Sequence, residues 1–385
     1  MNGQTRHAML PQASHDELAR QAFVQSFKIH LANEVSPGNR VVYEKRVLPA
    51  FEERNKRSFR DRHEVRKAMN RDAYHQLWSA LQRTSQEMMW DAVSTSVDRQ
   101  AEQLAARARQ CDGAPAGSLR LDPDLPLPRY HAAVDIHCQP GGYHTELRAD
   151  DVAAGAIYDR AVYIYTMGRA GALNDDMGNS VVLRLQRDYP DFRPRRILDM
   201  GCTVGHSTLP YVDAWPGAEV HGIDVAAPVL RYAHGRAESL GRRVHFSQQN
   251  AEHTDFEDES FDLVVSHILF HETSARALKN IVRECHRLLR PGGLMAHLEV
   301  PPYAGMDLYD QHMLDWDTYN NNEPFWGASH EISYEKPGTE AGFAAENLVQ
   351  TLTPSALVDA RKRTGVFQGG DFAGAGQWFL YLGRK

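Results

Sequence analysis

The hydrophobic pattern changes once along the chain. From about His15 to Arg109, apolar side chains such as Leu77, Leu81 and Met88 recur at helical spacing, and glycine is almost absent. This spacing predicts amphipathic helices. From Arg196 onward, short apolar runs alternate with turns and with helical stretches. That alternation predicts a parallel sheet with helices on its faces. The chain is therefore expected to combine an α-helical N-terminal part with an α/β part.

Composition shifts suggest three regions. Residues 111–128 are rich in proline and glycine, which predicts a linker. We expect an α-helical N-terminal region over 1–128 that includes this linker, a cap segment over 129–190, and an α/β domain over 191–385. In the cap segment, residues 132–137 are expected to form a short strand.

An insertion at about residues 303–330 mixes aromatic side chains with many acids. That mixture suits a substrate cap with apolar walls and a few placed polar groups. The alternative is a helical excursion that packs its aromatic rings on the sheet. Residues 45–71 carry more basic than acidic side chains, which indicates either a solvated helical face or a patch for an anionic partner.

The α/β part carries a strand, a turn and a helix at Ile197–Pro210. Asp199 ends the apolar run, and Gly201 and Gly205 follow it. Glycine is required where the backbone turns sharply or approaches a ligand, and a helix N-terminus offers free N–H groups to an anionic group. The segment therefore predicts a nucleotide-type pocket. The dinucleotide fingerprint requires a third glycine that is absent here, which disfavours a nicotinamide cofactor.

The same segment resembles motif I of the class I S-adenosylmethionine-dependent methyltransferases, in which apolar residues precede Asp, x, Gly, Cys, x, x, Gly. Further elements follow at family-like spacing: Asp224 after a second strand, Asn250-Ala251 after a third, and Arg290-Pro-Gly-Gly before a fifth. The resemblance covers about residues 190–300 strongly and 370–385 weakly. It is closest to small-molecule methyltransferases of the ubiquinone/menaquinone C-methyltransferase type.

The resemblance implies a Rossmann-like, mostly parallel seven-stranded sheet with an antiparallel last strand, and S-adenosylmethionine as the cofactor. An acid in the position of Asp224 accepts hydrogen bonds from ribose hydroxyls in dinucleotide folds. The implied cofactor-binding residues follow the ends of successive strands: Asp199, Gly201, Cys202, Gly205, His206, Asp224, Val225, Asn250, Ala251 and Ser266.

Candidate catalytic residues follow the fourth strand, where ligands bind in open α/β sheets. They are His267, His271 and Glu272. Methyl transfer is an in-line displacement, so a base is needed only when the acceptor must lose a proton. His271 is the preferred base because an unperturbed imidazole has a pKa of about 6.5; the alternative is that this His-Glu pair orients the loop. These residues and Glu299 match no known ligand spacing, so no metal is expected.

Composition limits the partners. The net charge is −7 and the pI about 6.2, which gives no electrostatic case for a nucleic-acid or membrane partner. No apolar run reaches the roughly 18 residues of a membrane span, and the scattered cysteines predict reduced thiols. We expect a cytoplasmic methyltransferase with a small-molecule acceptor; no sequence feature specifies an oligomeric state. The alternatives are a nicotinamide-dependent oxidoreductase and a non-catalytic S-adenosylmethionine-binding protein that docks a partner.

Overall fold

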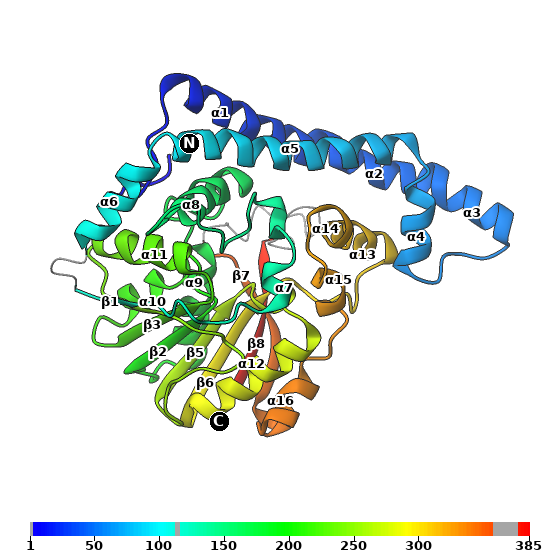
Figure 1. The fold of residues 1–385 in the computed structure, drawn as a ribbon. Coiled ribbons are helices and arrows are strands. Elements are labelled where there is room, and N and C mark those ends of the chain that lie inside the picture. Colours follow the sequence, from blue (N-terminus) through cyan, green and yellow to red (C-terminus); the bar gives the residue numbers. More distant parts are fainter. Residues whose placement is uncertain (1–2, 112–115, 357–375) are drawn as a thin grey trace.

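The computed structural model describes residues 3–111, 116–356 and 376–385 (Figure 1). Its centre is an eight-stranded sheet in the order β1-β4-β3-β2-β5-β6-β8-β7. The pairs from β1 to β6 are parallel, and β8 runs antiparallel to both β6 and β7. The strands are β1 (Ser118–Arg120), β2 (Arg196–Met200), β3 (Glu219–Asp224), β4 (His245–Gln248), β5 (Phe261–His267), β6 (Leu289–Glu299), β7 (Leu348–Pro354) and β8 (Gln377–Arg384).

The Rossmann-like α/β sheet and the helical N-terminal region are confirmed, with one strand more than predicted. The extra strand β1 comes from residues 111–128, which the sequence pattern predicted to be a linker. Ser118–Arg120 pairs with His245–Ser247 and so satisfies backbone groups at the edge of β4. Gly117 permits this approach, because a Cβ there would lie 2.1 Å from the Val244 carbonyl oxygen.

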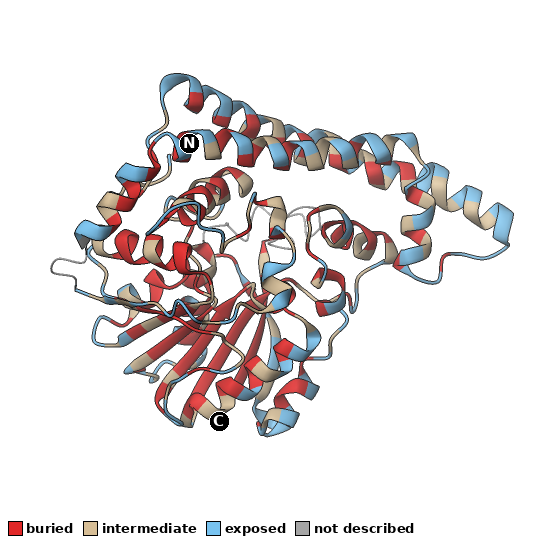
Figure 2. Cartoon of the chain, viewed as in Figure 1, coloured by how far each residue is buried: buried red, intermediate tan, exposed pale blue. Residues whose placement is uncertain are grey.

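Both faces of the sheet are buried, as expected for parallel strands (Figure 2). Alternate residues of β2 face opposite cores: Ile197 packs with α9 (Asp176–Asp188), and Leu198 packs with α12 (Ala275–Leu288). The helices α8 (Ala153–Tyr165), α10 (Leu209–Ala214) and α11 (Ala227–Ser239) complete the layers around the sheet.

The N-terminal region forms a helical arm that lies across the α/β part (Figure 1). Its helices α2 and α3 each carry a proline in their first turn and each follow a π-helical turn. A proline removes a backbone N–H donor, so the preceding turn widens while the helical direction continues. The elements are α1 (His15–His30), η1 (Leu31–Val35), α2 (Ser36–Val42), η2 (Tyr43–Val47), α3 (Leu48–Asn55), α4 (Arg62–Met69), α5 (Ala73–Asp98) and α6 (Ala101–Cys111).

The expected strand over 132–137 is wrong. The structure has α7 (Arg129–Ala132) and a 3-10 turn, η3 (Ile136–Cys138), instead. His137 and Cys138 have φ values of 53° and 61°, which an extended strand does not allow. The turn directs His137 toward the α/β part.

The insertion at 303–330 forms α13 (Leu308–Leu314), α14 (Trp316–Asn320) and α15 (Trp326–Ser329). We call residues 303–331 the cap, which is distinct from the cap segment predicted over 129–190. Tyr309 and Trp316 of the cap share a core with Val65, Met69 and Trp78 of the arm, rather than packing on the sheet. The chain continues through α16 (Glu335–Ala341) and η5 (Ala345–Asn347) into β7.

Charged side chains also join the arm to the cap. Arg40 pairs with Asp307 and Asp310, and Arg62 pairs with Asp315. Part of the basic segment of the arm therefore neutralises acids of the cap. Across the described residues, no helix is long and apolar enough to cross a membrane.

Candidate functional site

A cavity opens at the carboxyl ends of β2 to β5, the edge at which parallel sheets bind ligands. One part of its wall comes from the glycine loop and the ends of β3 and β4. The other part comes from residues 130–158 and from the segment after β5. The lining residues are Tyr130, His131, His137, Tyr143, Tyr158, Gly201, Thr203, Asp224, Val225, Gln249, Asn250, Ala251, His267, Ile268, Leu269, Glu272, Thr273 and Ile281.

The glycine loop requires its glycines for conformation and space. Gly201 and Gly205 have φ values of 71° and 77°, in the left-handed region. A Cβ on Gly201 would also lie 2.7 Å from Leu269 Cδ1. Thr203, which the sequence pattern did not single out, donates its backbone N–H to Asp224 Oδ2 over 3.1 Å. The loop is thus tied to the end of β3.

Asp224 presents a carboxylate at the cavity wall. Its Oδ1 also accepts a hydrogen bond from the Ala226 backbone N–H, 2.9 Å away. Burial raises the pKa of Asp224 to about 6, against the backbone N–H groups, which lower it. Each carboxylate oxygen retains capacity for a further hydrogen bond from a ligand hydroxyl.

Five of the ten proposed cofactor-binding residues line the cavity: Gly201, Asp224, Val225, Asn250 and Ala251. The others lie outside its lining. Asp199 is buried and accepts a hydrogen bond from Thr208 Oγ1 over 2.6 Å, while its Oδ1 has no hydrogen-bond partner within the described ranges. Gly205 lies within the loop.

The remaining three are buried beside or behind the loop. Cys202 is 6% exposed, and Ser266 Oγ is 2.7 Å from His297 Nδ1. His206 Nε2 is 2.7 Å from Asp159 Oδ1. Direct cofactor contact by these residues remains a prediction.

The three proposed catalytic residues differ in their surroundings. His267 lines the cavity, but its ring nitrogens lie 3.0 Å from Tyr211 Oη and 3.4 Å from Asp199 Oδ1. Glu272 lines the cavity, and its Oε1 is 2.8 Å from His137 Nε2. His271 is 1% exposed, lies outside the lining and has Nδ1 2.8 Å from Glu299 Oε2.

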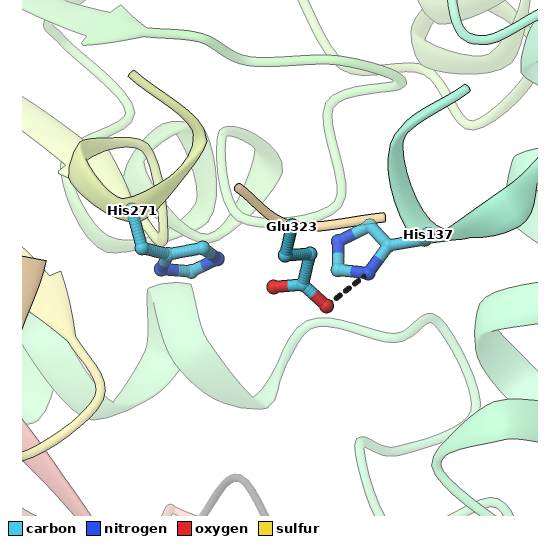
Figure 3. Close-up of side chains that lie close together, drawn as sticks. All are labelled: His137, His271 and Glu323. Carbon is cyan, nitrogen blue, oxygen red and sulfur yellow. Dashed lines mark ion pairs between the residues drawn. The ribbon is translucent and has the colours of Figure 1, made fainter. Parts of the chain in front are cut away.

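His137 joins this group from a segment that the sequence pattern did not link to it. Its Nε2 is 2.8 Å from Glu272 Oε1, and its Nδ1 is 2.9 Å from Glu323 Oε1 in the cap (Figure 3). Burial acts to lower the pKa of His137, but the two carboxylates raise it well above its usual value. Burial also acts to lower the pKa of His271, but Glu299 raises this pKa above its usual value.

The pKa values of two carboxyl groups near these imidazoles are shifted in opposite directions. Burial acts to raise the pKa of Glu272, but the charge and hydrogen bond of His137 lower it. In the cap, burial and then the charge of Glu323 raise the pKa of Asp317 well above its usual value. Glu272 is thus ionised at the cavity wall.

Three tyrosines also line the cavity: Tyr130, Tyr143 and Tyr158. Tyr130 Oη donates to Glu252 over 2.9 Å, and the rings of Tyr143 and Tyr158 meet edge to face at 5.5 Å. The sequence pattern did not assign these tyrosines to a site, because tyrosines in helices and turns more often pack in the core.

The sheet with its antiparallel β8, the glycine loop after β2 and the acid after β3 define a class I S-adenosylmethionine-dependent methyltransferase domain. Residues 197–293 match the family described as "Methyltransferase domain". The cofactor of this class is S-adenosylmethionine.

Curated relatives carry several acceptor names. A demethylmenaquinone methyltransferase from Thermus thermophilus is 38% identical over 109 residues, 28% of this chain and 49% of the relative. A malonyl-[acyl-carrier protein] O-methyltransferase from Methylococcus capsulatus is 34% identical over 128 residues, 32% of this chain and 44% of the relative. A tRNA N(3)-methylcytidine methyltransferase from Drosophila melanogaster is 27% identical over 117 residues, 29% and 36% respectively. The chain thus spans about half the length of these relatives or less.

Proposed function

We propose that the protein transfers the methyl group of S-adenosylmethionine to a small-molecule acceptor. One observation carries this proposal: the cavity that Gly201, Asp224 and Asn250 line is also lined by Glu272 and by tyrosines from residues 130–158. We call the part of the cavity lined by Gly201, Asp224 and Asn250 the donor half, and the part lined by Glu272 and the tyrosines the acceptor half. The two halves share one space.

The residues of the donor half fit the cofactor. Asp224 offers acceptor oxygens to ribose hydroxyls, and Asn250-Ala251 lies beside it at the end of β4. The absence of a side chain at Gly201 lets a ligand approach the backbone. Asp199 Oδ1, buried beneath the loop, has no hydrogen bond within the described part of the chain and lies 3.4 Å from His267 Nδ1. When bound, S-adenosylmethionine supplies an electrophilic methyl group on a positively charged sulfur.

The acceptor half favours a small molecule. Tyr130, Tyr143 and Tyr158 form aromatic walls that orient an acceptor and exclude water. Holding the nucleophile in line with the methyl group supplies most of the rate in such a displacement.

Glu272 is the residue we assign to accept a proton from the acceptor. It lines the cavity and hydrogen-bonds His137, which keeps it ionised. His271 lies outside the lining, and its charge helps to lower the pKa of Glu272, whose Oε1 is 3.9 Å from His271 Nε2. His267 bridges Tyr211 and Asp199 and acts as a positioning residue for the glycine loop.

The experiment is incubation of the full chain with methyl-labelled S-adenosylmethionine and two fractions of the source organism, metabolites and RNA. We expect label in the metabolite fraction. Glu272→Gln should lower kcat by about 100-fold or more while the Kd for the cofactor stays unchanged. Label in RNA alone, or in neither fraction, would contradict the proposal.

A glycine pair provides the matched control for the donor half. Gly201 and Gly241 both have positive φ values, 71° and 68°, but only Gly201 lines the cavity. A Cβ on Gly241 would meet no atom of the described residues within 4 Å. Gly201→Ala should abolish labelling and weaken cofactor binding, whereas Gly241→Ala should retain both.

A further inference from the structure

His137, His271 and Glu323 converge from three separate parts of the chain. His137 belongs to η3, His271 to η4 (Phe270–Glu272) and Glu323 to the cap. One potential ligand atom from each lies within 4.8 Å of the other two. Figure 3 shows the two rings and the carboxylate lying side by side.

Two atoms of this group are buried and have no hydrogen-bond partner among the residues that the structure describes. They are His271 Nε2 and Glu323 Oε2, on residues that are 1% and 2% exposed. The nearest carboxylate oxygen to His271 Nε2, Glu272 Oε1, is 3.9 Å away, beyond hydrogen-bond distance. A buried polar atom without a partner costs free energy, so these two atoms point to a ligand between them.

The opposite nitrogen of each ring is held by a carboxylate. His137 Nε2 is 2.8 Å from Glu272 Oε1, and His271 Nδ1 is 2.8 Å from Glu299 Oε2. This is the arrangement that orients metal-binding histidines, whose outer ring nitrogen donates to a carboxylate. Asn321 Nδ2 donates to Glu323 Oε1 over 2.7 Å and fixes the third side chain.

Three carboxylates surround the two imidazoles. The carboxylates of Glu272, Glu299 and Glu323 all contact one of these rings. His137 Nδ1 and Glu323 Oε1 are only 2.9 Å apart, so a proton or a cation must lie between them. Ligand atoms bound to one ion at about 2.1 Å lie about 3.4 Å apart in a tetrahedral site and about 3.0 Å apart in an octahedral site, so this separation fits a five- or six-coordinate ion.

We propose that His137 Nδ1, His271 Nε2 and Glu323 bind a divalent first-row transition-metal ion, with Glu272 and Glu299 orienting the two rings. Two imidazoles and a carboxylate favour Zn²⁺, Fe²⁺ or Co²⁺ over Mg²⁺ and Ca²⁺, which prefer oxygen ligands alone. His137 and Glu272 also line the cavity, so the ion lies behind its wall. On the proposed function, this wall belongs to the acceptor half.

The test measures metal binding to the full chain after chelator treatment and dialysis. Titration with Co²⁺ should give one bound equivalent with visible absorption bands of nitrogen and oxygen ligation, and Zn²⁺ should abolish the bands. Excess Mg²⁺ should not. His271→Gln and Glu323→Gln should each weaken Zn²⁺ binding by more than about 100-fold, because loss of an outer carboxylate alone costs roughly 10- to 100-fold. Glu299→Gln should fall within that smaller range.

The matched control is His221→Gln, which removes an imidazole 2.6 Å from the carboxylate of Glu219 on β3. It should bind Zn²⁺ as the parent protein does. Calorimetry with S-adenosylmethionine identifies variants that keep the fold, and it separates metal binding from methyl transfer. Absence of a stoichiometric Co²⁺ spectrum, or unchanged affinity in folded His271→Gln and Glu323→Gln proteins, would overturn the metal site.

Discussion

Two opposing effects act on the pKa of Asp224. It accepts two backbone hydrogen bonds, which favour its ionised form, and yet its pKa is raised to about 6. Burial at the cavity wall is the larger effect, and the nearby charge of Asp199 acts in the same direction. The residue therefore changes charge just below neutral pH, where the Kd for S-adenosylmethionine can be measured against pH to detect the change.

Cofactor affinity should fall as the pH falls through about 6. Ribose hydroxyls donate better to a carboxylate than to a carboxylic acid, so binding below this pKa must first release a proton. The Kd for S-adenosylmethionine should rise by up to about tenfold for each pH unit below 6. Calorimetry between pH 5 and 8 measures the slope.

Asp224→Asn is the control for that slope. The amide carries no charge and does not titrate. The Kd of this variant for S-adenosylmethionine should be higher by roughly 10- to 100-fold at pH 7.5, because charge-assisted hydrogen bonds are lost. Its pH dependence below 6 should disappear. An identical slope in both proteins would assign the titration to another residue.

At the scale of elements, the contact between the arm and the cap is built on buried charge. Arg62 Nε is 3.1 Å from Asp315 Oδ2, and its guanidinium lies 4.5 Å from the centre of the Tyr303 ring. Tyr303 Oη donates to Asp315 Oδ1 over 3.2 Å. The Asp315 side chain is 2% exposed, so it depends on Arg62 for its charge balance.

Arg62→Ala should release the cap from the arm. It leaves the buried Asp315 charge without its partner, at an expected cost of about 3 kcal/mol in the free energy of unfolding. Hydrogen exchange should become faster in residues 303–331, and the KM for the acceptor should rise. Arg46→Ala removes a pair between an exposed guanidinium and Asp72 inside the N-terminal region, and it should leave exchange in the cap unchanged. Equal effects of both substitutions would show that the cap is held by its apolar contacts.

At the scale of the whole molecule, Asp159 on α8 connects distant segments. Its carboxylate lies within 3.0 Å of His7 near the N-terminus, His206 in the glycine loop and Tyr232 on α11. Asp159 is fully buried. Burial acts to raise its pKa, but His206 and Arg236 hold the pKa well below its usual value. One carboxylate therefore holds the N-terminus, the glycine loop and a sheet-covering helix together.

Asp159→Asn should destabilise the protein by about 3 kcal/mol or more at pH 7, because buried partners lose their counter-charge. A lowered folded-state pKa means that this stabilisation is complete above the unfolded value of about 3.9 and is lost as the pH falls toward the folded value. Urea unfolding from pH 7 to pH 3 should therefore show the difference between the two proteins narrowing below about pH 4.

The exposed pair of His15 and Asp16 offers the comparison for Asp159. Asp16→Asn removes a carboxylate whose side chain is 84% exposed, so it should not change the unfolding free energy measurably. A constant difference between parent and Asp159→Asn across the whole pH range would contradict the role given to the charge.

The sequence alone determined the alternation of strands and helices from β2 to β6 and the place of the glycine loop. Ile197 and Leu198 are apolar on consecutive positions because both faces of β2 are buried, and Gly201 is required by its own backbone conformation. Such signals lie within one segment, where periodicity and backbone sterics act. The strand expected at 132–137 failed because the left-handed backbone of His137 has no such local signature.

The tertiary structure alone decided which side chains meet. His137 comes to His271 and Glu323, and Arg62 comes to Asp315, across separations that no local pattern spans. These contacts depend on how the arm, η3 and the cap pack on the carboxyl edge of the sheet. Burial then sets the charge state of each group, because desolvation and neighbouring charges act only after the segments have come together.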